Sequence, residues 1–254
     1  MPGLTPAQLQ RFHEDGYVVV DNVLDDAAVD TLRAALDELE ARDIDDASVI
    51  RGGGHIVTIH GLPLQQGPLS QVLRYRPVVE LLERLADAPI QITGGVLLDK
   101  HPEHNWDIGW HPDNGIYVHA IPDGAPEDIR GGLPVYSTLG MEMAGNVSCR
   151  LALDPAGLDS GGLWVLPKSH LENHGPAGDA KTRFAADPGV LAAQAPGSAL
   201  CFRPLLLHRT EKMTAPGRRR ILHLQYGPND LVLPGTETYH WPLPRPLTAI
   251  DRLS

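Results

Sequence analysis

The hydrophobic positions in the first part of the chain follow a helical pattern, interrupted by short extended runs. A capping box beginning at Thr5 predicts the start of one helix. Asp25 is expected to cap a second helix, in which apolar residues recur every three or four positions. A third helix is predicted over residues 69–86, with Pro77 splitting or kinking it. We therefore expect residues 1–89 to form a helical N-terminal part.

After residue 90 the pattern changes to short apolar or alternating runs, which clusters of Gly, Pro and Asp separate. Several strands at this spacing after a helical opening are typical of a β-sandwich or barrel carrying N-terminal helices. This core is expected over residues 90–227. Residues 119–140 are rich in Gly and Pro without a period, which predicts a long loop of a functional or mobile kind. The Pro-rich residues 228–254 are expected to run over the surface, so that residues 1–254 form a single domain.

The composition limits the classes of partner that this domain can have. The chain has 254 residues, a net charge of −11 and 42% hydrophobic residues, as expected for a soluble globular protein. No basic stripe stands out, which argues against nucleic acid as the main partner. No apolar run approaches the ~20 residues of a membrane span, and no secretory signal opens the chain. We expect a cytoplasmic protein, monomeric or weakly homo-oligomeric, that binds no membrane.

The segment GWHPDNGIYV contains a candidate pair of metal ligands, His111 and Asp113. Residues two apart in an extended segment point to the same side, so the two side chains could converge on one point. A further histidine, His208, ends the apolar run Leu-Leu-Leu-His and needs a partner if it is buried there. Two histidines and one carboxylate form the facial triad that binds non-haem Fe(II) and leaves coordination positions open.

A candidate anion-binding pair follows on the next predicted strand. The open positions on the iron must accept a reductant and O2, and a 2-oxo dicarboxylate could chelate the metal through one end. Its remote carboxylate then needs a fixed cation. Arg219 lies eleven residues after His208, and an antiparallel return through a Pro-Gly turn would bring it beside His208 and Thr210. A guanidinium pairs with a carboxylate in a bidentate manner, and the Thr210 hydroxyl could donate another hydrogen bond.

Four segments of the chain resemble one known family. They are LTPAQLQRFHEDGYVVVDNVL near the N-terminus, WHPD at 110–113, LALDPAGLDSGGLWVLPKSH at 151–170 and HRTEKMTAPGRRRILHLQYGP at 208–228. In that order they resemble the phytanoyl-CoA dioxygenase family of Fe(II)- and 2-oxoglutarate-dependent oxygenases. The resemblance implies a mainly β (α+β) fold, a double-stranded β-helix (a cupin-like jelly roll) with the N-terminal helices packed on one sheet. It implies that His111, Asp113 and His208 bind iron, and that Arg219 and Thr210 hold 2-oxoglutarate.

The chain departs from this family at Arg150, where many relatives carry Trp. A cation pointing into the barrel could contact 2-oxoglutarate or a substrate carboxylate, whereas an outward arginine would form a surface salt bridge. We keep both alternatives, with Arg150 as a candidate cofactor-binding residue. Halogenases of the family lack the carboxylate ligand, so the presence of Asp113 argues against halogenation.

The substrate-binding residues are predicted from their positions near the metal segment and the long loop. The candidates are Trp110, Tyr117, Tyr136 and Met141, with packing beside the metal turn as the alternative for Trp110. His223 shares a predicted face with Arg219 and could line the barrel. Arg218 and Arg220 should point away from Arg219 onto a solvated face. Eight further histidines are interpreted as surface or structural residues: His13, His55, His60, His101, His104, His170, His174 and His240.

The predicted function is oxidation of an unactivated C–H bond in a small metabolite, with Fe(II), 2-oxoglutarate and O2 as cofactors. Hydroxylation in bacterial specialised metabolism, such as antibiotic biosynthesis, is the first expectation. Cyclisation, desaturation or epimerisation would require a different fate of the same substrate radical. A cupin-like metal enzyme that does not use 2-oxoglutarate is the second alternative. A non-catalytic binding protein is the third, but it predicts a broken triad, and the triad here is intact.

Overall fold

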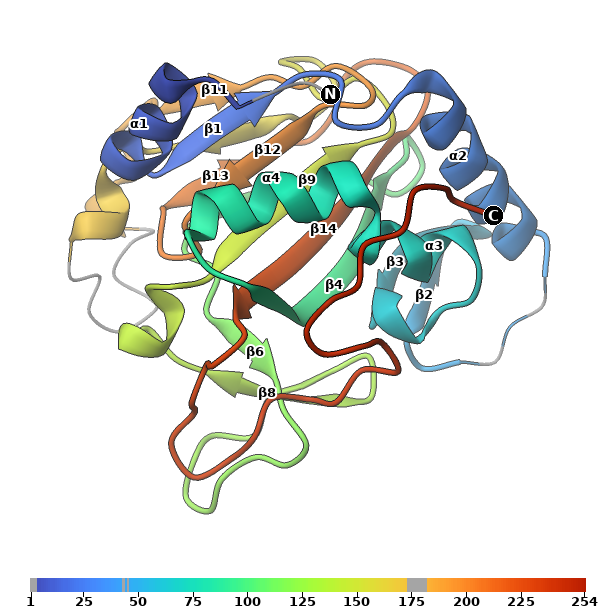
Figure 1. Ribbon diagram of the computed structural model, residues 1–254. Helices are drawn as coiled ribbons and strands as arrows, with labels where there is room; N and C mark the ends of the chain where they lie inside the picture. The colour runs from blue at the N-terminus through green and yellow to red at the C-terminus, as the bar shows by residue number, and fades with distance from the viewer. Residues whose placement is uncertain (1–3, 43, 45, 173–181) are drawn as a thin grey trace.

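The computed structural model describes residues 4–42, 44, 46–172 and 182–254 (Figure 1). Two facing antiparallel sheets form its core, and the helices lie on the outer side of the larger sheet. The inner face of the larger sheet meets the smaller one through Leu200 and Phe202, which pack against Leu163, Val165 and Ala192. The predicted mainly β jelly roll with N-terminal helices on one sheet is confirmed.

The larger sheet has seven strands in the order β1-β12-β9-β14-β4-β3-β2, and each neighbouring pair is antiparallel. Its strands are Tyr17–Val20 (β1), Val49–Gly52 (β2), His55–His60 (β3), Ile90–Lys100 (β4), Val147–Ala152 (β9), Ala199–Phe202 (β12) and Arg219–Pro228 (β14). The central strands β9 and β14 are buried on both faces, because helices cover one face and the second sheet covers the other.

Shorter strands form two further sheets. A four-stranded sheet has the order β11-β10-β13-β5, and a three-stranded sheet has the order β6-β8-β7. Their bounds are Ile108–His111 (β5), Gly115–Tyr117 (β6), Ile129–Arg130 (β7), Leu133–Ser137 (β8), Leu163–Val165 (β10), Val190–Ala192 (β11) and His208–Thr210 (β13). The predicted long loop over residues 119–140 is therefore wrong in part, since it contains the β7–β8 hairpin.

The N-terminal helices begin where the sequence predicts them to begin. The helices are Pro6–Asp15 (α1), Asp26–Glu40 (α2), Pro68–Gln71 (α3) and Arg76–Ala86 (α4), with short 3-10 turns at Leu62–Leu64, Val72–Arg74, Met141–Met143 and Ser169–Leu171. Thr5 closes a capping box on α1, and Asp25 accepts from the Ala28 backbone at the start of α2. The helix predicted over residues 69–86 is split ahead of Pro77, which lies in the first turn of α4. Figure 1 shows α4 lying across the outer face of the larger sheet.

The C-terminal residues do more than cover the surface. Trp241 and Leu233 are buried, and Trp241 belongs to the main hydrophobic core. The backbone N–H of Tyr239 donates to the carbonyl of Tyr117 at 2.8 Å. The tail is therefore a packed part of the fold that supports the strand β6.

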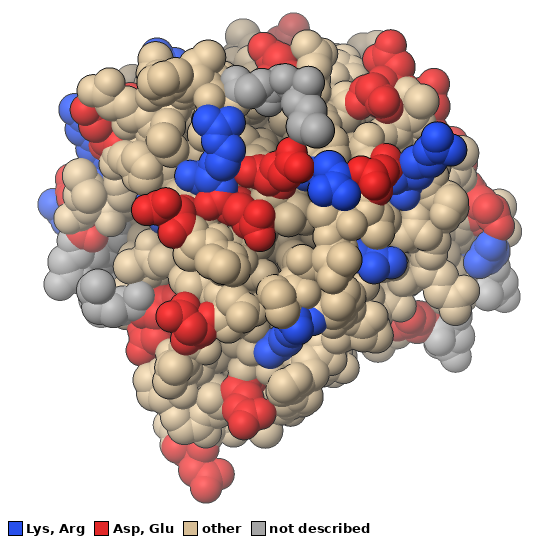
Figure 2. Space-filling model, viewed as in Figure 1, with Lys and Arg blue, Asp and Glu red and all other residues tan. Residues whose placement is uncertain are grey.

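The charged surface is mixed. Figure 2 shows basic and acidic side chains interleaved in one band on the viewed face, without a continuous basic area on the part of it that is described. Among the helices of the described ranges, none is long and apolar enough to cross a membrane.

The two arginines that flank Arg219 are paired, and the prediction of a solvated face for them is wrong. Arg220 is buried, and its guanidinium donates to both carboxylate oxygens of Asp154 at 2.8 and 3.0 Å. Arg218 is half-buried and donates to Glu40 of α2 at 2.8 Å. Helix α2 lies over this edge of the sheet, so side chains that leave the barrel meet acidic partners instead of water.

Replacing Arg220 with Met is expected to destabilise the fold by about 3 kcal/mol, because Asp154 would then keep a buried charge without its main partner. For a chain of this size the melting temperature should fall by roughly 6–12 °C. Arg42→Met is the matched control, since Arg42 forms an exposed pair with Glu38 and its loss should change stability by less than about 0.5 kcal/mol. Equal melting temperatures for the two variants would contradict a structural role of the Arg220–Asp154 pair.

Candidate metal centre and active-site cavity

Three potential metal ligands from distant parts of the sequence meet between the two sheets. His111 is the last residue of β5, Asp113 lies just beyond it, and His208 begins β13. Strands β5 and β13 are paired with His111 opposite His208, and the two ring centroids are 4.3 Å apart. One ligand atom from each of the three residues lies within 4.8 Å of the others. The pairing of β5 with β13 thus brings His111 and Asp113 next to His208.

Backbone carbonyls orient both imidazoles. Nδ1 of His111 donates to the carbonyl of Gly109 at 2.8 Å, and Nδ1 of His208 donates to that of Leu206 at 2.9 Å. A carbonyl oxygen can only accept, so this contact fixes the tautomer and leaves the Nε2 lone pair free. Metal-binding histidines are commonly held in this manner.

The carboxylate of Asp113 is held by two further side chains. Ser148 donates to Oδ2 at 2.7 Å, and Nε2 of His223 lies 3.3 Å from the same oxygen. Oδ1 lies 3.6 Å from Nε2 of His208, on the side of the cluster. One carboxylate oxygen is therefore engaged by the protein, and the other faces the imidazoles.

Electrostatics favours the ligand forms of these groups at neutral pH. Burial would raise the pKa of Asp113, but the nearby imidazoles of His223, His208 and His111 outweigh it and lower that pKa. Burial, and then the neighbouring His111, lowers the pKa of His208 to about 3. An ionised carboxylate and neutral imidazoles are the forms that bind a metal. Two histidines and one carboxylate, with the remaining positions open, fit iron(II).

A cavity extends from this cluster between the sheets and ends at a buried arginine. Arg219 lines the cavity, is 1% exposed, and its Nε and Nη1 have no hydrogen-bond partner among the described residues. Burial, and then the charge of Arg150, lowers its pKa to about 9, so it stays a cation at neutral pH. Burying an unpaired guanidinium is costly, which indicates that an anion completes the site.

Lys100 forms the rest of this cationic end, and the sequence interpretation did not include it. It faces Arg219 in the register of β4 and β14 and is fully buried. Its Nζ donates to Oγ1 of Thr210 at 2.8 Å and to the carbonyl of Glu211. The Thr210 hydroxyl in turn donates to the carbonyl of Gly161 at 2.9 Å. Burial, and then the charges of Arg219 and Arg150, lowers the pKa of Lys100 to about 7.

Arg150 and His223 both face the cavity, which resolves the two alternatives left open for Arg150. The two residues lie opposite each other in the register of β9 and β14, and both line the cavity. Arg150 is 6% exposed, and its Nε has no hydrogen-bond partner in the described part of the chain. Its charge acts on Asp113 and His208 at the metal cluster and on Arg219 at the other end. The guanidinium therefore lies between the two ends of the cavity.

The four predicted substrate contacts do not all line the cavity. Tyr117 lines the cavity, whereas Trp110 and Tyr136 are not among its described lining residues. Trp110 packs with Leu207 on the opposite side of β5, because neighbouring residues in a strand alternate faces and His111 points inward. Tyr136 pairs with Ile116 and packs with it on the face that Tyr117 does not use. Met141 begins a 3-10 turn, and its side chain lies outside the described part of the structure.

Other lining residues come from segments that the sequence interpretation did not connect with the site. His60, taken as surface or structural, lines the cavity and lies 3.2 Å from the Tyr117 hydroxyl through Nδ1. Arg130 reaches the cavity from the β7–β8 hairpin and pairs with Asp128 at 2.7 Å. Trp106 lines it from the segment after β4. His174, one of the eight other histidines, lies outside the described residues.

Residues 12–221 match the family described as phytanoyl-CoA dioxygenase (PhyH). Among curated proteins, L-proline trans-4-hydroxylase from Streptomyces griseoviridis is 22% identical over 229 residues, which cover 85% of this chain and 84% of that protein. A second similar protein, EctD from S. alaskensis, has solved structures with bound iron and with 2-oxoglutarate and 5-hydroxyectoine.

Two solved structures show that the fold is shared. EctD from S. alaskensis in its apoform has a TM-score of 0.72 and 20% identity, covering 97% of this chain and 86% of that chain. The non-heme alpha ketoglutarate dependent carbocyclase SnoK from nogalamycin biosynthesis has a TM-score of 0.66 and 20% identity, covering 90% of this chain and 85% of that chain.

Proposed function

We propose that this chain oxidises an unactivated C–H bond of a small metabolite, because it belongs to the phytanoyl-CoA dioxygenase family and is a non-haem iron, 2-oxoglutarate-dependent dioxygenase. Its cofactors are Fe(II), 2-oxoglutarate and O2. The observation that carries the proposal is a single cavity with a His-Asp-His cluster on one side and an unpaired, buried Arg219 on the other.

In this proposal His111, Asp113 and His208 hold the iron. When bound, iron supplies the activation of O2, which is coupled to decarboxylation of 2-oxoglutarate to succinate and to oxidation of the substrate. Ser148 and His223 keep one oxygen of Asp113 engaged, so that the other oxygen is directed toward the metal position.

Arg219 is the proposed partner of the distal carboxylate of 2-oxoglutarate. A bidentate pair would satisfy the guanidinium nitrogens that lack partners in the protein. Lys100 adds a second positive charge and holds the Thr210 hydroxyl, whose hydrogen is directed to Gly161 in this structure. Thr210 therefore serves as an acceptor for Lys100 and contacts the carboxylate after rotation of its hydroxyl.

Arg150 is the proposed partner of the other carboxylate, the one next to the keto group. Arg150 and Arg219 are buried, and neither forms an ion pair with another described residue. Their two positive charges therefore favour a ligand with two negative charges. 2-Oxoglutarate is such a dianion, and its inner carboxylate would lie between the metal position and Arg150. In this arrangement the buried Arg150 guanidinium would gain a counter-charge.

The substrate is proposed to enter at the mouth of the cavity, beside Tyr117, His60 and Arg130. Tyr117 and His60 offer a hydrogen-bonded pair, and Arg130 offers a cation partly neutralised by Asp128. Hydroxylation of a small polar metabolite fits this lining, as in the proline hydroxylase relative. Cyclisation, desaturation and epimerisation remain alternative outcomes, and a similar structure is a carbocyclase from nogalamycin biosynthesis. We also propose a cytoplasmic enzyme of bacterial specialised metabolism, monomeric or weakly homo-oligomeric.

Anaerobic addition of Fe(II) and 2-oxoglutarate tests the proposal and separates it from a cupin-like enzyme that does not use 2-oxoglutarate. Chelation of the metal by the keto acid should produce a weak visible metal-to-ligand band, which iron alone does not give. Bound iron without this band would contradict the assignment of the cavity to 2-oxoglutarate, and absence of bound iron would contradict the triad.

Raising the pH from 6 to 8 is expected to weaken 2-oxoglutarate binding. Lys100 has a pKa of about 7 in the free protein, and a bound dianion stabilises its protonated form. Affinity should therefore be highest below pH 7 and fall as Lys100 loses its proton, by up to about tenfold for each unit by which the ligand raises that pKa.

The measurement is a titration of the visible band with metal kept saturating at each pH. Lys100→Met is the control, because it should bind more weakly below pH 7 and should lose this pH dependence. The same pH dependence in Lys100→Met would assign it to another group.

A further inference from the structure

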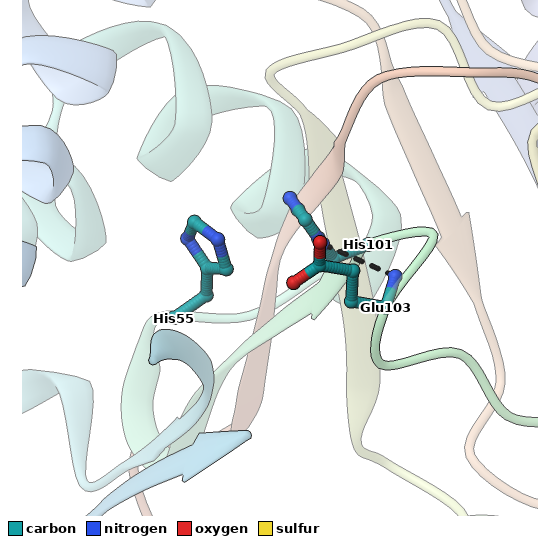
Figure 3. Close-up of side chains that lie close together, drawn as sticks. All are labelled: His55, His101 and Glu103. Atoms are coloured by element: carbon teal, nitrogen blue, oxygen red, sulfur yellow. Dashed lines mark hydrogen bonds between the residues drawn. The ribbon is translucent and has the colours of Figure 1, made fainter. Parts of the chain in front are cut away.

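We infer that His55, His101 and Glu103 form a second binding site for a divalent transition metal ion such as Zn2+, separate from the proposed iron centre (Figure 3). None of the three is among the described residues that line the active-site cavity. The inference is independent of the proposed function, since it rests on a different group of side chains.

The three side chains converge from two neighbouring segments. His55 begins β3, His101 directly follows β4, and Glu103 lies two residues further in the turn. One possible ligand atom from each lies within 4.8 Å of the others, the same limit that the His111 cluster meets. The two rings are stacked with centroids 4.1 Å apart. Figure 3 shows the Glu103 carboxylate beside the His101 ring, on the side facing His55.

A fixed carboxylate orients His55. Its Nδ1 lies 3.2 Å from Oε1 of Glu40, which also accepts from the backbone N–H of Ile56 at 2.9 Å. Burial would raise the pKa of Glu40, but the Ile56 N–H and Arg218 outweigh it and lower that pKa, so Glu40 is ionised. An anion at this position accepts a hydrogen bond from Nδ1–H of His55 and leaves the Nε2 lone pair free for a metal, which is the carboxylate–histidine arrangement of established metal sites.

The other two ligands are carried by a closed turn. Backbone hydrogen bonds of 3.1 and 2.9 Å join His101 and His104 in both directions. The tip of the β2–β3 hairpin packs onto this turn so closely that a Cβ on Gly52 would lie 2.3 Å from Nδ1 of His104. Nδ1 of His101 accepts a long hydrogen bond of 3.3 Å from the backbone of Glu103, a contact that a metal ion at this nitrogen would replace. The site therefore needs little rearrangement to bind.

The donor set determines the class of ion. Two imidazoles and one carboxylate suit Zn2+ and other borderline transition ions, with water in the remaining position. Ca2+ and Mg2+ prefer oxygen ligands and are not expected to compete. A bound ion would join the β2–β3 hairpin to the segment that follows β4, and this segment carries Trp106 and Ile108 into the cavity wall. Occupancy should therefore stiffen one side of the cavity mouth.

A third group, His119, Glu237 and His240, provides a matched control. Its ligand atoms also meet the 4.8 Å limit, but all three residues are exposed. Nε2 of His240 lies 3.4 Å from Glu237, its partner three residues earlier. This group lacks the features that pre-form the site at His55, namely the partial burial of both histidines and the closed turn that carries His101 and the exposed Glu103.

The test counts zinc ions bound per chain by metal analysis after dialysis against zinc buffered at low micromolar free concentration. The wild-type chain should bind two, one at each proposed centre. His101→Gln and Glu103→Gln should each bind one fewer, Asp113→Ala should also bind one fewer, and His240→Gln should bind the wild-type number. Zinc should raise the melting temperature of Asp113→Ala, and this increase should disappear when His101→Gln is added.

Retention of the full number of zinc ions by both His101→Gln and Glu103→Gln would overturn the inference, as would an equal loss in His240→Gln. Circular dichroism and melting in chelator distinguish loss of a site from loss of the fold. A variant that unfolds is set aside in favour of the other substitution.

Discussion

The Asp113→Ala variant is expected to lose iron binding by more than about 100-fold and to lose coupled formation of succinate with it. Removal of residues that merely orient a metal ligand costs about 10–100-fold, so removal of a ligand should cost more. Asp113 also offsets the charge of the nearby Arg150. Its loss removes the one anionic ligand of the metal position and leaves the Arg150 cation uncompensated, which repels a divalent ion.

Iron binding is measured by equilibrium dialysis, and turnover by succinate release. Ser148→Ala is the matched control, because Ser148 donates to Asp113 but is not itself a proposed metal ligand. It should reduce iron affinity by about 10–100-fold while the visible band with 2-oxoglutarate remains at saturating iron. Normal iron binding in Asp113→Ala would exclude this carboxylate as a ligand.

Arg219→Gln and Arg150→Gln are expected to weaken keto-acid binding in distinguishable ways. Each removes a buried guanidinium from a ligand carboxylate, and losing one partner of such a pair costs about 2–5 kcal/mol. This corresponds to roughly 30- to 5,000-fold in the dissociation constant. The two variants should differ when 2-oxoglutarate is compared with pyruvate, which has the keto group and inner carboxylate but lacks the distal one.

Arg219→Gln should weaken 2-oxoglutarate strongly and leave pyruvate nearly unchanged, since pyruvate has no group to bind there. Arg150→Gln should weaken both ligands by a similar factor, because both carry the inner carboxylate. The measurement is anaerobic titration of the metal-to-ligand band. Arg209→Gln serves as control, as Arg209 lies between His208 and Thr210 but packs outward on Trp110 and Trp164.

The outcomes distinguish a failure of the proposed function from a failure of the role proposed for Arg150. No band with either ligand in the wild-type chain would contradict the proposed function itself. A wild-type band with unchanged affinities in Arg150→Gln would contradict the role of Arg150 alone and leave the role of Arg219 intact.

The metal cluster could be predicted because its ligands lie in short, recognisable sequence patterns. His111 and Asp113 are two residues apart, and His208 ends an apolar strand, so alternation and burial were enough to suggest convergence. Arg219 followed from the length of one antiparallel return. Asp113 lies in the same segment as His111, and Arg219 lies on the strand that follows His208, whereas His208 comes almost a hundred residues after His111 and was found from its position at the end of an apolar run.

The remaining lining residues depend on strand pairings that no local pattern specifies. Lys100 lies beside Arg219 because β4 pairs with β14, more than a hundred residues later in the chain, and it reaches Thr210 on β13 of the other sheet. Arg130 depends on a hairpin whose first strand has only two residues, within a Gly- and Pro-rich stretch. The placement of Trp110 was foreseeable, since the alternation that directs His111 inward directs its neighbour outward.

The cavity depends on two parts of the chain, the region that matches the family and the packed C-terminal tail. The family match ends at residue 221, whereas Trp241 lies beyond it and contacts the ring of Tyr117, with centroids 5.5 Å apart. The proposed iron and 2-oxoglutarate residues all lie inside the match, but one wall of the proposed substrate entrance rests on residues outside it. Mutations in the tail can therefore reshape what the enzyme accepts while the oxidising machinery is inherited unchanged, so this short segment is a natural place for new substrate preferences to arise.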